Sequence, residues 1–476
     1  MNFNDYNLDE RINKAIGFLK YTEPTKVQQE VIPRLLAKKN VVVKSETGSG
    51  KTASYGIPLC DIVDEEKSEI EALILVPTRE LALQVKEELG SIGRIKKVRT
   101  TAIFGKQPFK EQERELKQRV HIVAGTPGRV MDHIKRGNLK LNALKYVIID
   151  EADKMLNMGF IDQVQDILRT LPAKRVMAMF SATIPEELEG VCKKHMGKYE
   201  VVEIENEKKE RNITESYLKI DNDNKARLLL KELYGLNPDA AMVFCNTKDK
   251  VREVYEFLRK NKVSVNELHG DMDQKSRIQT MNDFKNGKFR VLVATDIAAR
   301  GIDVDQVTHV FNYEVPMEQE SYVHRIGRTG RAGRRGTAIT FMAQWEEKFL
   351  KSVEEFIGYK IPLGAFPDDE AVRKGKELFL SDGGNTGKAT VRKDKVQKEV
   401  TKIYLGAGKK KKIRTVDIVG ALSNLPEITS EDIGIIDVQD QISYVDILNN
   451  KGKKLLKNYS QITIKGKSVR LEEARK

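Results

Sequence analysis

Cysteine, histidine and tryptophan are scarce in this chain of 476 residues, which holds 3, 6 and 1 of them. The three widely spaced cysteines make neither a disulfide framework nor a zinc site, and no spacing of the histidines suggests a metal site, so a reducing cytoplasm is expected. Long apolar runs are missing too, because stretches such as Ala72–Val76 are far shorter than the roughly 20 residues of a membrane span. The polar N-terminus has no apolar signal region. These absences argue against disulfide-rich secreted proteins and helical membrane proteins.

Positive charge is in excess, since 83 lysines and arginines face 70 aspartates and glutamates, for a formal net charge of +13. The excess is uneven, because residues 388–476 carry +9 of it and include the run Lys409–Lys412. Such a run is typical of a solvated tail and also of a segment that binds a polyanion.

The first 362 residues alternate short β-branched runs with amphipathic stretches, which is typical of α/β domains with parallel sheets. Within residues 1–205 the expected strands are Val41–Lys44, Ala72–Val76, Val98–Ile103, Val120–Ala124, Tyr146–Ile149 and Val176–Phe180. Within residues 206–362 they are Met242–Cys245, Ser264–Leu268, Arg290–Ala294, His309–Asn312 and Thr337–Met342. The length fits more than one core, so two tandem α/β domains are predicted.

The last part of the chain follows a different pattern. Residues 363–399 are polar and glycine-containing, and we expect a linker with a short helix there. Residues 400–476 predict a small α+β domain of βαββαβ order, the order of an RNA-recognition motif. Its expected elements are a strand around Ile403, a helix at Val416–Leu425, strands at Ile433–Val438 and Ile442–Leu448, a helix at Lys453–Tyr459 and a strand at Ser468–Leu471.

A glycine-rich turn follows the first expected strand. It reads Ser45-Glu46-Thr47-Gly48-Ser49-Gly50-Lys51-Thr52 and leads into a helix. A strand, such a turn and a helix N-terminus point backbone N–H groups at a phosphate. Lys51 would reach the β- and γ-phosphates and the Thr52 hydroxyl would hold Mg²⁺, although Ser45 stands where this loop usually begins with glycine.

An acidic quartet, Asp150-Glu151-Ala152-Asp153, follows the strand expected at Tyr146–Ile149. Carboxylates at the C-terminal end of a parallel strand face the crevice where ligands bind. We expect Asp150 to bind Mg²⁺, mostly through water, and Glu151 to orient or deprotonate the attacking water. The sequence therefore predicts a nucleoside triphosphate hydrolase that uses Mg²⁺.

The quartet spells D-E-A-D, and the chain resembles the DEAD-box ATP-dependent RNA helicases, which have two RecA-like domains. The resemblance implies that the nucleotide is ATP. Further motifs that resemble the family's occur in order at Tyr21–Gln28, Pro77–Leu81, Thr126–Arg129, Ser181–Thr183, Ala294–Asp303 and His324–Arg331. The resemblance covers residues 3–362. Two positions depart from it, because Lys20 and Lys106 stand where the family has glycine.

The resemblance implies a role for each matching residue. Gln28 would read the adenine edge, Phe3 and Tyr21 would lie near the base, and Asp303 would contact the ribose. Arg328 and Arg331 would act as arginine fingers on the γ-phosphate. The residues expected to couple ATP to RNA are Asp153, Ser181, Thr183 and His324. The residues expected to contact the RNA backbone are Thr78, Arg79, Gly105, Thr126, Arg129 and Thr295.

The tail resembles that of the DbpA type of bacterial DEAD-box helicase, on the segments Ile403–Gly406, Gly408–Arg414, Asp432–Ile435 and Ser443–Val445. That type binds a hairpin of 23S ribosomal RNA and acts in large-subunit assembly, so rRNA and pre-50S particles are the implied partners. Two ways of binding remain open. Tyr404 could stack a base on the sheet face. The alternative is phosphate binding through Lys409, Lys410, Lys411, Lys412, Arg414, Lys451, Lys453 and Lys454.

The predicted function is that of a cytoplasmic, monomeric, RNA-stimulated ATPase that unwinds short RNA duplexes and has no DNA or membrane partner. Because the P-loop and the arginine fingers lie on different domains, hydrolysis requires closure, and RNA bound across both domains favours the closed state. An ATP-switched RNA clamp or annealing chaperone would share every motif. A DNA helicase is disfavoured by the Gln28 motif and by the tail.

Overall fold

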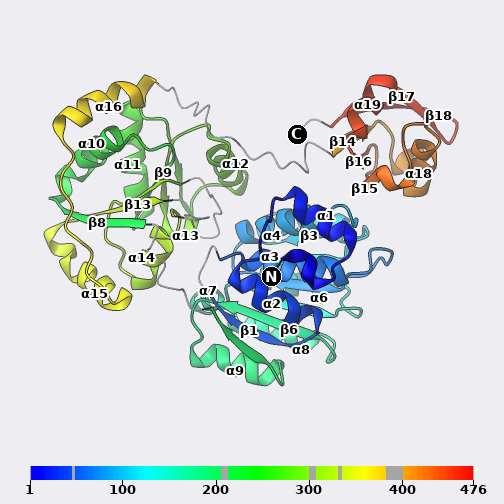
Figure 1. The fold of residues 1–476 in the computed structure, drawn as a ribbon, viewed down its shortest axis with the longest axis horizontal. Helices are drawn as coiled ribbons and strands as arrows, with labels where there is room; N and C mark the ends of the chain where they lie inside the picture. The colour runs from blue at the N-terminus through cyan, green and yellow to red at the C-terminus, as the bar shows by residue number, and fades with distance from the viewer. Residues whose placement is uncertain are drawn as a thin grey trace. The chain divides into compact units, whose positions relative to one another are not determined.

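The computed structural model describes residues 2–45, 49–204, 213–299, 307–330, 335–381 and 400–474. These residues form two parallel sheets, which belong to separate compact units, and one antiparallel sheet (Figure 1). The predicted fold class is confirmed. Within the described ranges, no helix combines the length and the apolar character that crossing a bilayer requires.

The first sheet has seven strands in the order β3-β4-β2-β5-β6-β1-β7, and neighbouring strands pair in parallel. Their bounds are β1 (Val41–Lys44), β2 (Ala72–Leu75), β3 (Thr100–Ile103), β4 (Ile122–Gly125), β5 (Tyr146–Ile149), β6 (Val176–Ser181) and β7 (Glu200–Glu203). The six predicted strands are confirmed, with ends displaced by no more than two residues. The edge strand β7 was not predicted, because glutamates flank its two valines and only one of these is buried.

Helices cover both faces of this sheet, and alternate residues of β1 enter different cores: Val41 and Val43 pack on one side and Val42 on the other. Strands buried on both faces read as continuous apolar runs, which is why they were visible in the sequence. The helical elements are η1 (Phe3–Tyr6), α1 (Glu10–Phe18), α2 (Lys26–Leu36), α3 (Lys51–Ile62), α4 (Arg79–Ile92), α5 (Phe109–Leu116), α6 (Pro127–Lys135), α7 (Ala152–Asn157), α8 (Ile161–Thr170) and α9 (Glu186–His195).

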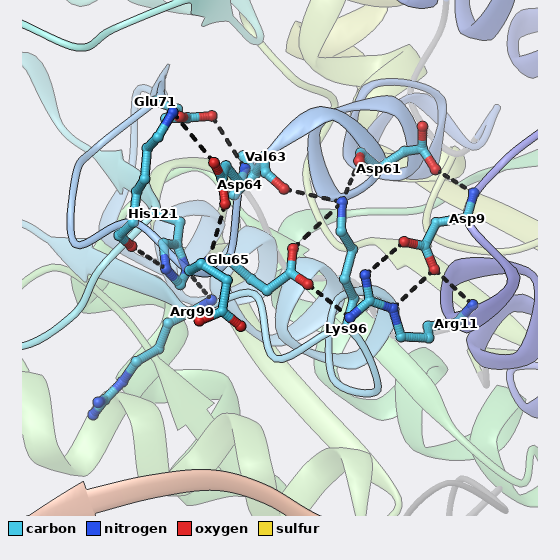
Figure 2. Close-up of polar contacts among 12 residues, drawn as sticks. Asp9, Arg11, Asp61, Val63, Asp64, Glu65, Glu71, Lys96, Arg99 and His121 are labelled. Carbon is cyan, nitrogen blue, oxygen red and sulfur yellow. Dashed lines mark hydrogen bonds and ion pairs between the residues drawn. The ribbon is translucent and has the colours of Figure 1, made fainter. Parts of the chain in front are cut away.

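A polar cluster fixes the C-terminal end of α3 (Figure 2). The buried Lys96 donates hydrogen bonds from Nζ to the carbonyl oxygens of Asp61 and Val63, the latter at 2.9 Å. These are carbonyls at a helix end, which lack partners within the helix. The backbone N–H of Asp9 donates to Asp61 Oδ1 at 2.7 Å, and Arg11 pairs with Asp9 at 2.7 Å. The N-terminal segment is thereby fastened to the helix whose other end follows the glycine-rich turn.

The second parallel sheet has six strands in the order β10-β11-β9-β12-β13-β8. Its strands are β8 (Ile213–Lys219), β9 (Ala241–Cys245), β10 (Val265–Leu268), β11 (Val291–Thr295), β12 (His309–Asn312) and β13 (Gly336–Met342). Its helical elements are η2 (Asn222–Asn224), α10 (Lys225–Leu236), α11 (Lys248–Lys260), α12 (Gln274–Lys285), α13 (Asp296–Ala299), α14 (Gln319–Ile326), η3 (Gln344–Glu346), α15 (Glu347–Ile357) and α16 (Asp369–Ser381). The five predicted strands are present, and β8 is an addition at the sheet edge.

Helix α16 lies in the stretch where a linker with a short helix was expected, and it packs along α10 (Figure 1). Phe379 is buried there, with its ring centroid 5.8 Å from that of Tyr234. The Arg290 guanidinium lies 4.2 Å from the same phenylalanine ring. Residues up to 381 therefore belong to the second unit, while residues 382–399 lie outside the described part of the chain.

The C-terminal domain is an antiparallel sheet in the order β15-β16-β14-β18-β17, with β14 in the middle. Its elements are β14 (Thr401–Leu405), η4 (Lys409–Lys411), α18 (Thr415–Ser423), η5 (Ser430–Asp432), β15 (Ile433–Val438), β16 (Ser443–Ile447), α19 (Lys451–Asn458), β17 (Gln461–Ile464) and β18 (Lys467–Glu473). Ile403 and Leu405 enter the core, as predicted. The predicted βαββαβ order is confirmed with one further strand, β17, which is short and pairs only with β18.

Candidate functional site

The candidate site residues of the first unit divide along the sheet. Thr78, Gly105 and Thr126, all expected to contact RNA, follow β2, β3 and β4, which are neighbouring strands. Ser45 and Asp150, expected to serve the nucleotide, follow β1 and β5. Because parallel strands end at one edge of the sheet, both groups lie along the same edge. The RNA residues occupy one half of it and the nucleotide residues the other.

The glycine-rich turn is described at Ser45 and from Ser49 onward, while Glu46, Thr47 and Gly48 lie outside the described residues. Lys51 is the first residue of α3, is buried, and donates a 3.1 Å hydrogen bond from Nζ to the carbonyl of Ser45. In the described part of the chain, the buried Ser45 hydroxyl has no hydrogen-bond partner. A buried ammonium beside an unused hydroxyl suits a phosphate ligand.

Gln28 joins its motif to this turn. Its Oε1 accepts from the backbone N–H of Thr25 at 3.0 Å, and its Nε2 donates to the carbonyl of Gly50 at 3.3 Å. The Thr25 hydroxyl donates to the carbonyl of Ser49 at 2.9 Å. Gly50 has a φ of +88°, a backbone conformation that favours glycine, and a Cβ there would lie 2.7 Å from Gln28 Nε2, so that the amide would have to shift. Adenine recognition by Gln28 stays a prediction.

The aromatic side chains expected near the base lie close together. The Phe3 and Tyr21 rings are 6.3 Å apart between centroids, with Phe3 buried and Tyr21 half-buried. This contact joins η1 to the turn that precedes α2. The structure therefore brings the two predicted residues together, and their contact with a base stays a prediction.

Asp150 follows β5 and is 3% exposed. Its Oδ1 accepts from the backbone N–H of Glu151 and its Oδ2 from the hydroxyl of Tyr55, both at 2.9 Å. Burial raises the pKa of Asp150, and the positive charge of Lys51 opposes that change. Tyr55 was not identified from the sequence, because a tyrosine one turn into a buried helix looks like ordinary core.

The residues proposed for Mg²⁺ fit the ion by their chemistry. In the described ranges, no group of three or more His, Cys, Asp or Glu side chains is arranged to hold a metal. Mg²⁺ does not need such a cage, because it is commonly held by one or two carboxylates, substrate phosphates and water. Asp150 and Thr52 supply a carboxylate and a hydroxyl, both hard oxygen donors.

Glu151 caps α7 with a φ of +54° and a ψ of +50°, a left-handed conformation that costs about 1–2 kcal/mol for a residue with a side chain. Its Oε1 accepts a hydrogen bond from Lys154 Nζ at 2.6 Å, and both side chains are buried. Lys154 was missed by sequence reasoning. The i, i+3 spacing on one helix was the available signal.

The predicted coupling residues of the first unit are in direct contact. Asp153 Oδ2 accepts from the backbone N–H groups of Ala182 and Thr183, at 3.0 and 3.2 Å. Ser181 Oγ accepts from the N–H of Asp153 at 3.1 Å and donates to the carbonyl of Thr183 at 2.6 Å. The acidic quartet after β5 and the motif after β6 therefore form one hydrogen-bonded unit.

On the RNA half of the edge, a buried glutamine links two motifs. Gln112 Nε2 donates to the carbonyl of Phe104 at 2.8 Å, next to Gly105. Its Oε1 accepts from Arg129 Nη1 at 3.1 Å, and Arg129 also donates to the carbonyl of Gln107 at 3.1 Å. Gln112 was not predicted, since its partners lie both before and after it in the chain.

The other RNA residues of this half lie at the starts of helices. Thr78 is the N-cap of α4, and its Oγ1 accepts from the N–H of Leu81 at 3.2 Å. Arg79, the first residue of α4, and Thr126, the N-cap of α6, are partly exposed. Both lysines that depart from the family pattern, Lys20 and Lys106, have a φ of +59°, the region that favours glycine.

In the second unit, Arg325 is 1% exposed and pairs with Asp296 through Nε and Nη2, each at 2.6 Å. Arg328 is buried, and its Nε donates to the carbonyl of His324 at 3.3 Å. These four residues line a small cavity. Thr295 ends β11, directly before Asp296. Asp303 and Arg331 lie outside the described residues.

In the C-terminal domain, lysines from distant segments gather. Lys465 and Lys467, near the β17–β18 turn, donate from Nζ to the carbonyls of Lys412 and Lys411, at 3.1 and 3.2 Å. We call the resulting surface the basic patch; its members are Lys409, Lys410, Lys411, Lys412, Lys465 and Lys467. Lys465 and Lys467 were not predicted, because only the register of the hairpin brings them here. Arg414 is exposed next to the patch.

The sheet face presents Tyr404 opposite Tyr444, with ring centroids 6.0 Å apart. Pairing places Asp437 beside Tyr444 and Glu472 beside Tyr404. Cations lie there as well, since Arg470 pairs with Glu472 and Lys402 Nζ lies 5.8 Å from the Tyr444 ring centroid. The basic patch carries six lysines, of which Lys465 pairs with Asp417 at 2.9 Å. The patch therefore has the larger excess of positive charge, and which of the two surfaces binds RNA stays a prediction.

Comparisons with known proteins agree with this division of the chain. Residues 25–191 match the family model for the DEAD/DEAH box helicase, residues 224–333 the helicase conserved C-terminal domain, and residues 402–473 the DbpA RNA binding domain. The chain is 47% identical to the ATP-dependent RNA helicase DbpA of Bacillus subtilis, over 100% of this chain and 99% of that protein. It is 42% identical to the DEAD-box ATP-dependent RNA helicase CshA of Geobacillus kaustophilus, over 74% and 76% of the two chains.

Solved structures match about four fifths of the chain. The S. cerevisiae Dbp5 structure bound to RNA and ADP BeF3 is 30% identical, covers 80% of this chain and 99% of its own, and has a TM-score of 0.71. Mss116p bound to single-stranded RNA and AMP-PNP is 26% identical, with coverage of 80% and 81% and a TM-score of 0.69. With the full-length match above, these findings show that the chain belongs to the DEAD-box family of ATP-dependent RNA helicases and carries a C-terminal RNA-binding domain of the DbpA type.

Proposed function

We propose that this helicase is tethered to 23S ribosomal RNA by residues 400–476 and unwinds short RNA duplexes nearby during assembly of the large ribosomal subunit in the cytoplasm. The observation that carries the proposal is the basic patch, on a domain whose family model is the DbpA RNA binding domain. The chain acts as a monomer, with pre-50S particles as its target.

ATP is held by the turn before α3 and by the motif that contains Gln28. Lys51 moves its ammonium from the Ser45 carbonyl to the β- and γ-phosphates. Thr52 and Asp150 would hold Mg²⁺, which would neutralise charge on the phosphate oxygens. Glu151, kept in place by Lys154, orients the attacking water and accepts its proton.

The second unit completes the site only when the two units close on ATP and RNA. Arg328 and Arg331 then neutralise the charge that develops on the γ-phosphate, while Asp303 contacts the ribose. Asp153, Ser181 and Thr183 transmit the state of the nucleotide to the RNA half of the sheet edge, and His324 does so from the second unit. Hydrolysis opens the enzyme again.

RNA is gripped by its backbone at the strand ends of both parallel sheets, which carries no sequence information. The residues proposed for this grip are Thr78, Arg79, Gly105, Thr126, Arg129 and Thr295. Closing on a bent strand separates a short duplex locally. The basic patch selects the RNA to which the helicase binds. The connection between the domains then raises the local concentration of the helicase core around that binding site.

The test of the tether is binding of the full chain, without ATP, to a 23S rRNA hairpin and to an unrelated hairpin of equal length. We expect the rRNA hairpin to bind more tightly. Equal affinities would contradict the specific tether. Strand displacement on a short duplex adjoining the hairpin then separates unwinding from ATP-switched clamping, because a clamp closes without releasing the strand.

A further inference from the structure

The buried phenol of Tyr55 belongs to α3, the helix that follows the nucleotide-binding turn. Tyr55 lies in the first turns of α3 and is 0% exposed, with its ring 5.2 Å from that of Phe180. Its hydroxyl donates to Asp150 Oδ2 at 2.9 Å. The hydrogen bond joins Asp150, one residue assigned to Mg²⁺, to α3, the helix that carries the other, Thr52.

The contact determines how the Asp150 carboxylate is turned. Oδ1 is held by the backbone N–H of Glu151 and Oδ2 by Tyr55. The terminal torsion of an aspartate is otherwise broad, so a donor on each oxygen restricts it. The Glu151 bond lies within β5 and its turn, whereas the Tyr55 bond reaches across to α3. Only the phenol ties the carboxylate to the helix that carries Thr52.

Packing alone does not account for the hydroxyl. The ring fills space against Phe180 inside the core that α3 shares with the sheet. A phenylalanine would fill that space without burying a polar atom, and burying one is costly unless it is hydrogen-bonded. The oxygen of Tyr55 thus acts through its hydrogen bond to Asp150.

We propose that Tyr55 is a positioning residue for Mg²⁺: its hydroxyl holds the Asp150 carboxylate in the orientation that the ion requires, and ties it to the helix that carries Thr52. This inference rests on the proposed assignment of Asp150 and Thr52 to the ion. Hydrogen-bond partners behind metal ligands typically contribute 10–100-fold in metal affinity or activity.

The test is Tyr55→Phe in the full chain, with two readouts taken over a range of Mg²⁺ concentrations. The first is binding of a fluorescent ADP analogue, and the second is RNA-stimulated ATP hydrolysis. We expect the half-maximal Mg²⁺ concentration to rise about tenfold in both. Turnover at saturating Mg²⁺ should fall less than turnover at limiting Mg²⁺.

Tyr322→Phe is the matched control. Tyr322 is also 0% exposed and donates to a buried carboxylate, Glu215 Oε2, at the same 2.9 Å, but it lies in the second unit. Its Mg²⁺ midpoints should equal those of the wild type. Unchanged midpoints in Tyr55→Phe, or equal shifts in both variants, would overturn the proposal in favour of packing or general destabilisation.

Asp150→Asn distinguishes the role proposed for Tyr55 from the assignment of Asp150 to Mg²⁺, on which that role depends. If Asp150→Asn leaves the Mg²⁺ midpoint of ADP binding at the wild-type value, the metal assignment fails and the role of Tyr55 fails with it. If Asp150→Asn raises the midpoint and Tyr55→Phe does not, only the role of Tyr55 is refuted.

Discussion

The first parallel sheet and the C-terminal domain present two different candidate surfaces for RNA. Along the sheet edge, the candidate contacts lie at strand ends and helix starts, and one of the two arginines among them, Arg129, is tied to Gln112 and to the carbonyl of Gln107. In the C-terminal domain the candidates are exposed lysines around η4, and residues 388–476 carry +9 of the chain's +13. The difference supports the proposal that the helicase core holds RNA by fixed geometry, whereas the tail holds it by charge.

The largest expected effect lies in the chemistry of the core. Glu151→Gln should lower RNA-stimulated ATP hydrolysis by about 10²–10⁴-fold, because general-base catalysis is lost while the shape of the site is kept. RNA binding in the presence of ATP should persist, which separates core chemistry from tail binding. Steady-state phosphate release measures the first and fluorescence anisotropy the second. Glu186→Gln, on the exposed start of α9, is the control, and a wild-type rate for Glu151→Gln would remove it from catalysis.

The next effect concerns charge in the tail. Lys409 and Lys410 are exposed, and no side-chain hydrogen bond or ion pair of theirs is present among the described residues, so Lys409→Gln/Lys410→Gln should leave the fold intact. The slope of log affinity against log salt should become shallower by about 2, close to a tenfold difference between about 50 and 200 mM salt. Lys457→Gln, exposed on α19 and not a member of the patch, should leave the slope unchanged. If Tyr404→Leu lost RNA binding instead, the result would indicate that the sheet face binds RNA.

A smaller effect is expected where the two halves of the core sheet communicate. Ser181→Ala removes the acceptor of the Asp153 N–H and the donor to Thr183. The ratio of RNA-stimulated to basal ATPase activity should fall about 5-fold or more, the usual size of a coupling free energy. Ser91→Ala removes a similar hydroxyl bond on the exposed face of α4 and serves as the control. An unchanged ratio would show that coupling does not pass through Ser181.

The sequence predicted those site residues that directly follow the ends of buried strands. A strand buried on both faces is an apolar run, so the positions of Ser45, Asp150 and Ser181 could be predicted, and the structure brings the last two motifs into contact. It missed Tyr55 and Gln112, whose importance depends on partners that are remote in sequence. It missed Lys465 because the register of a short hairpin, invisible in composition, carries it to the lysine run.

The smallest effect tests the two lysines that replace family glycines. Lys106 and Lys20 share a φ of +59°, so changing either to glycine should raise the free energy of unfolding by about 0.5–1 kcal/mol, after the entropy cost of glycine in the unfolded chain. Chemical denaturation measures both. Lys106 lies on the RNA half of the sheet edge and Lys20 does not. Weaker RNA binding in Lys106→Gly alone would therefore show that the positive charge of Lys106 contributes to RNA binding by the core. If both substitutions lowered the free energy of unfolding, the inference that the backbone is strained at these lysines would be contradicted.

The central claim is that the core binds RNA by geometry and the tail binds it by charge. Its most direct test is the RNA selectivity of ATPase stimulation, measured for the full chain and for residues 1–387. Solved relatives such as Dbp5 match four fifths of this chain with nearly their whole length, so this part of the fold exists without a tail. The account predicts that the full chain reaches half-maximal stimulation at a lower concentration of 23S rRNA hairpin than of unrelated RNA. Residues 1–387 should respond equally to both RNAs and keep the maximal rate. Selectivity that survives the truncation would contradict the account.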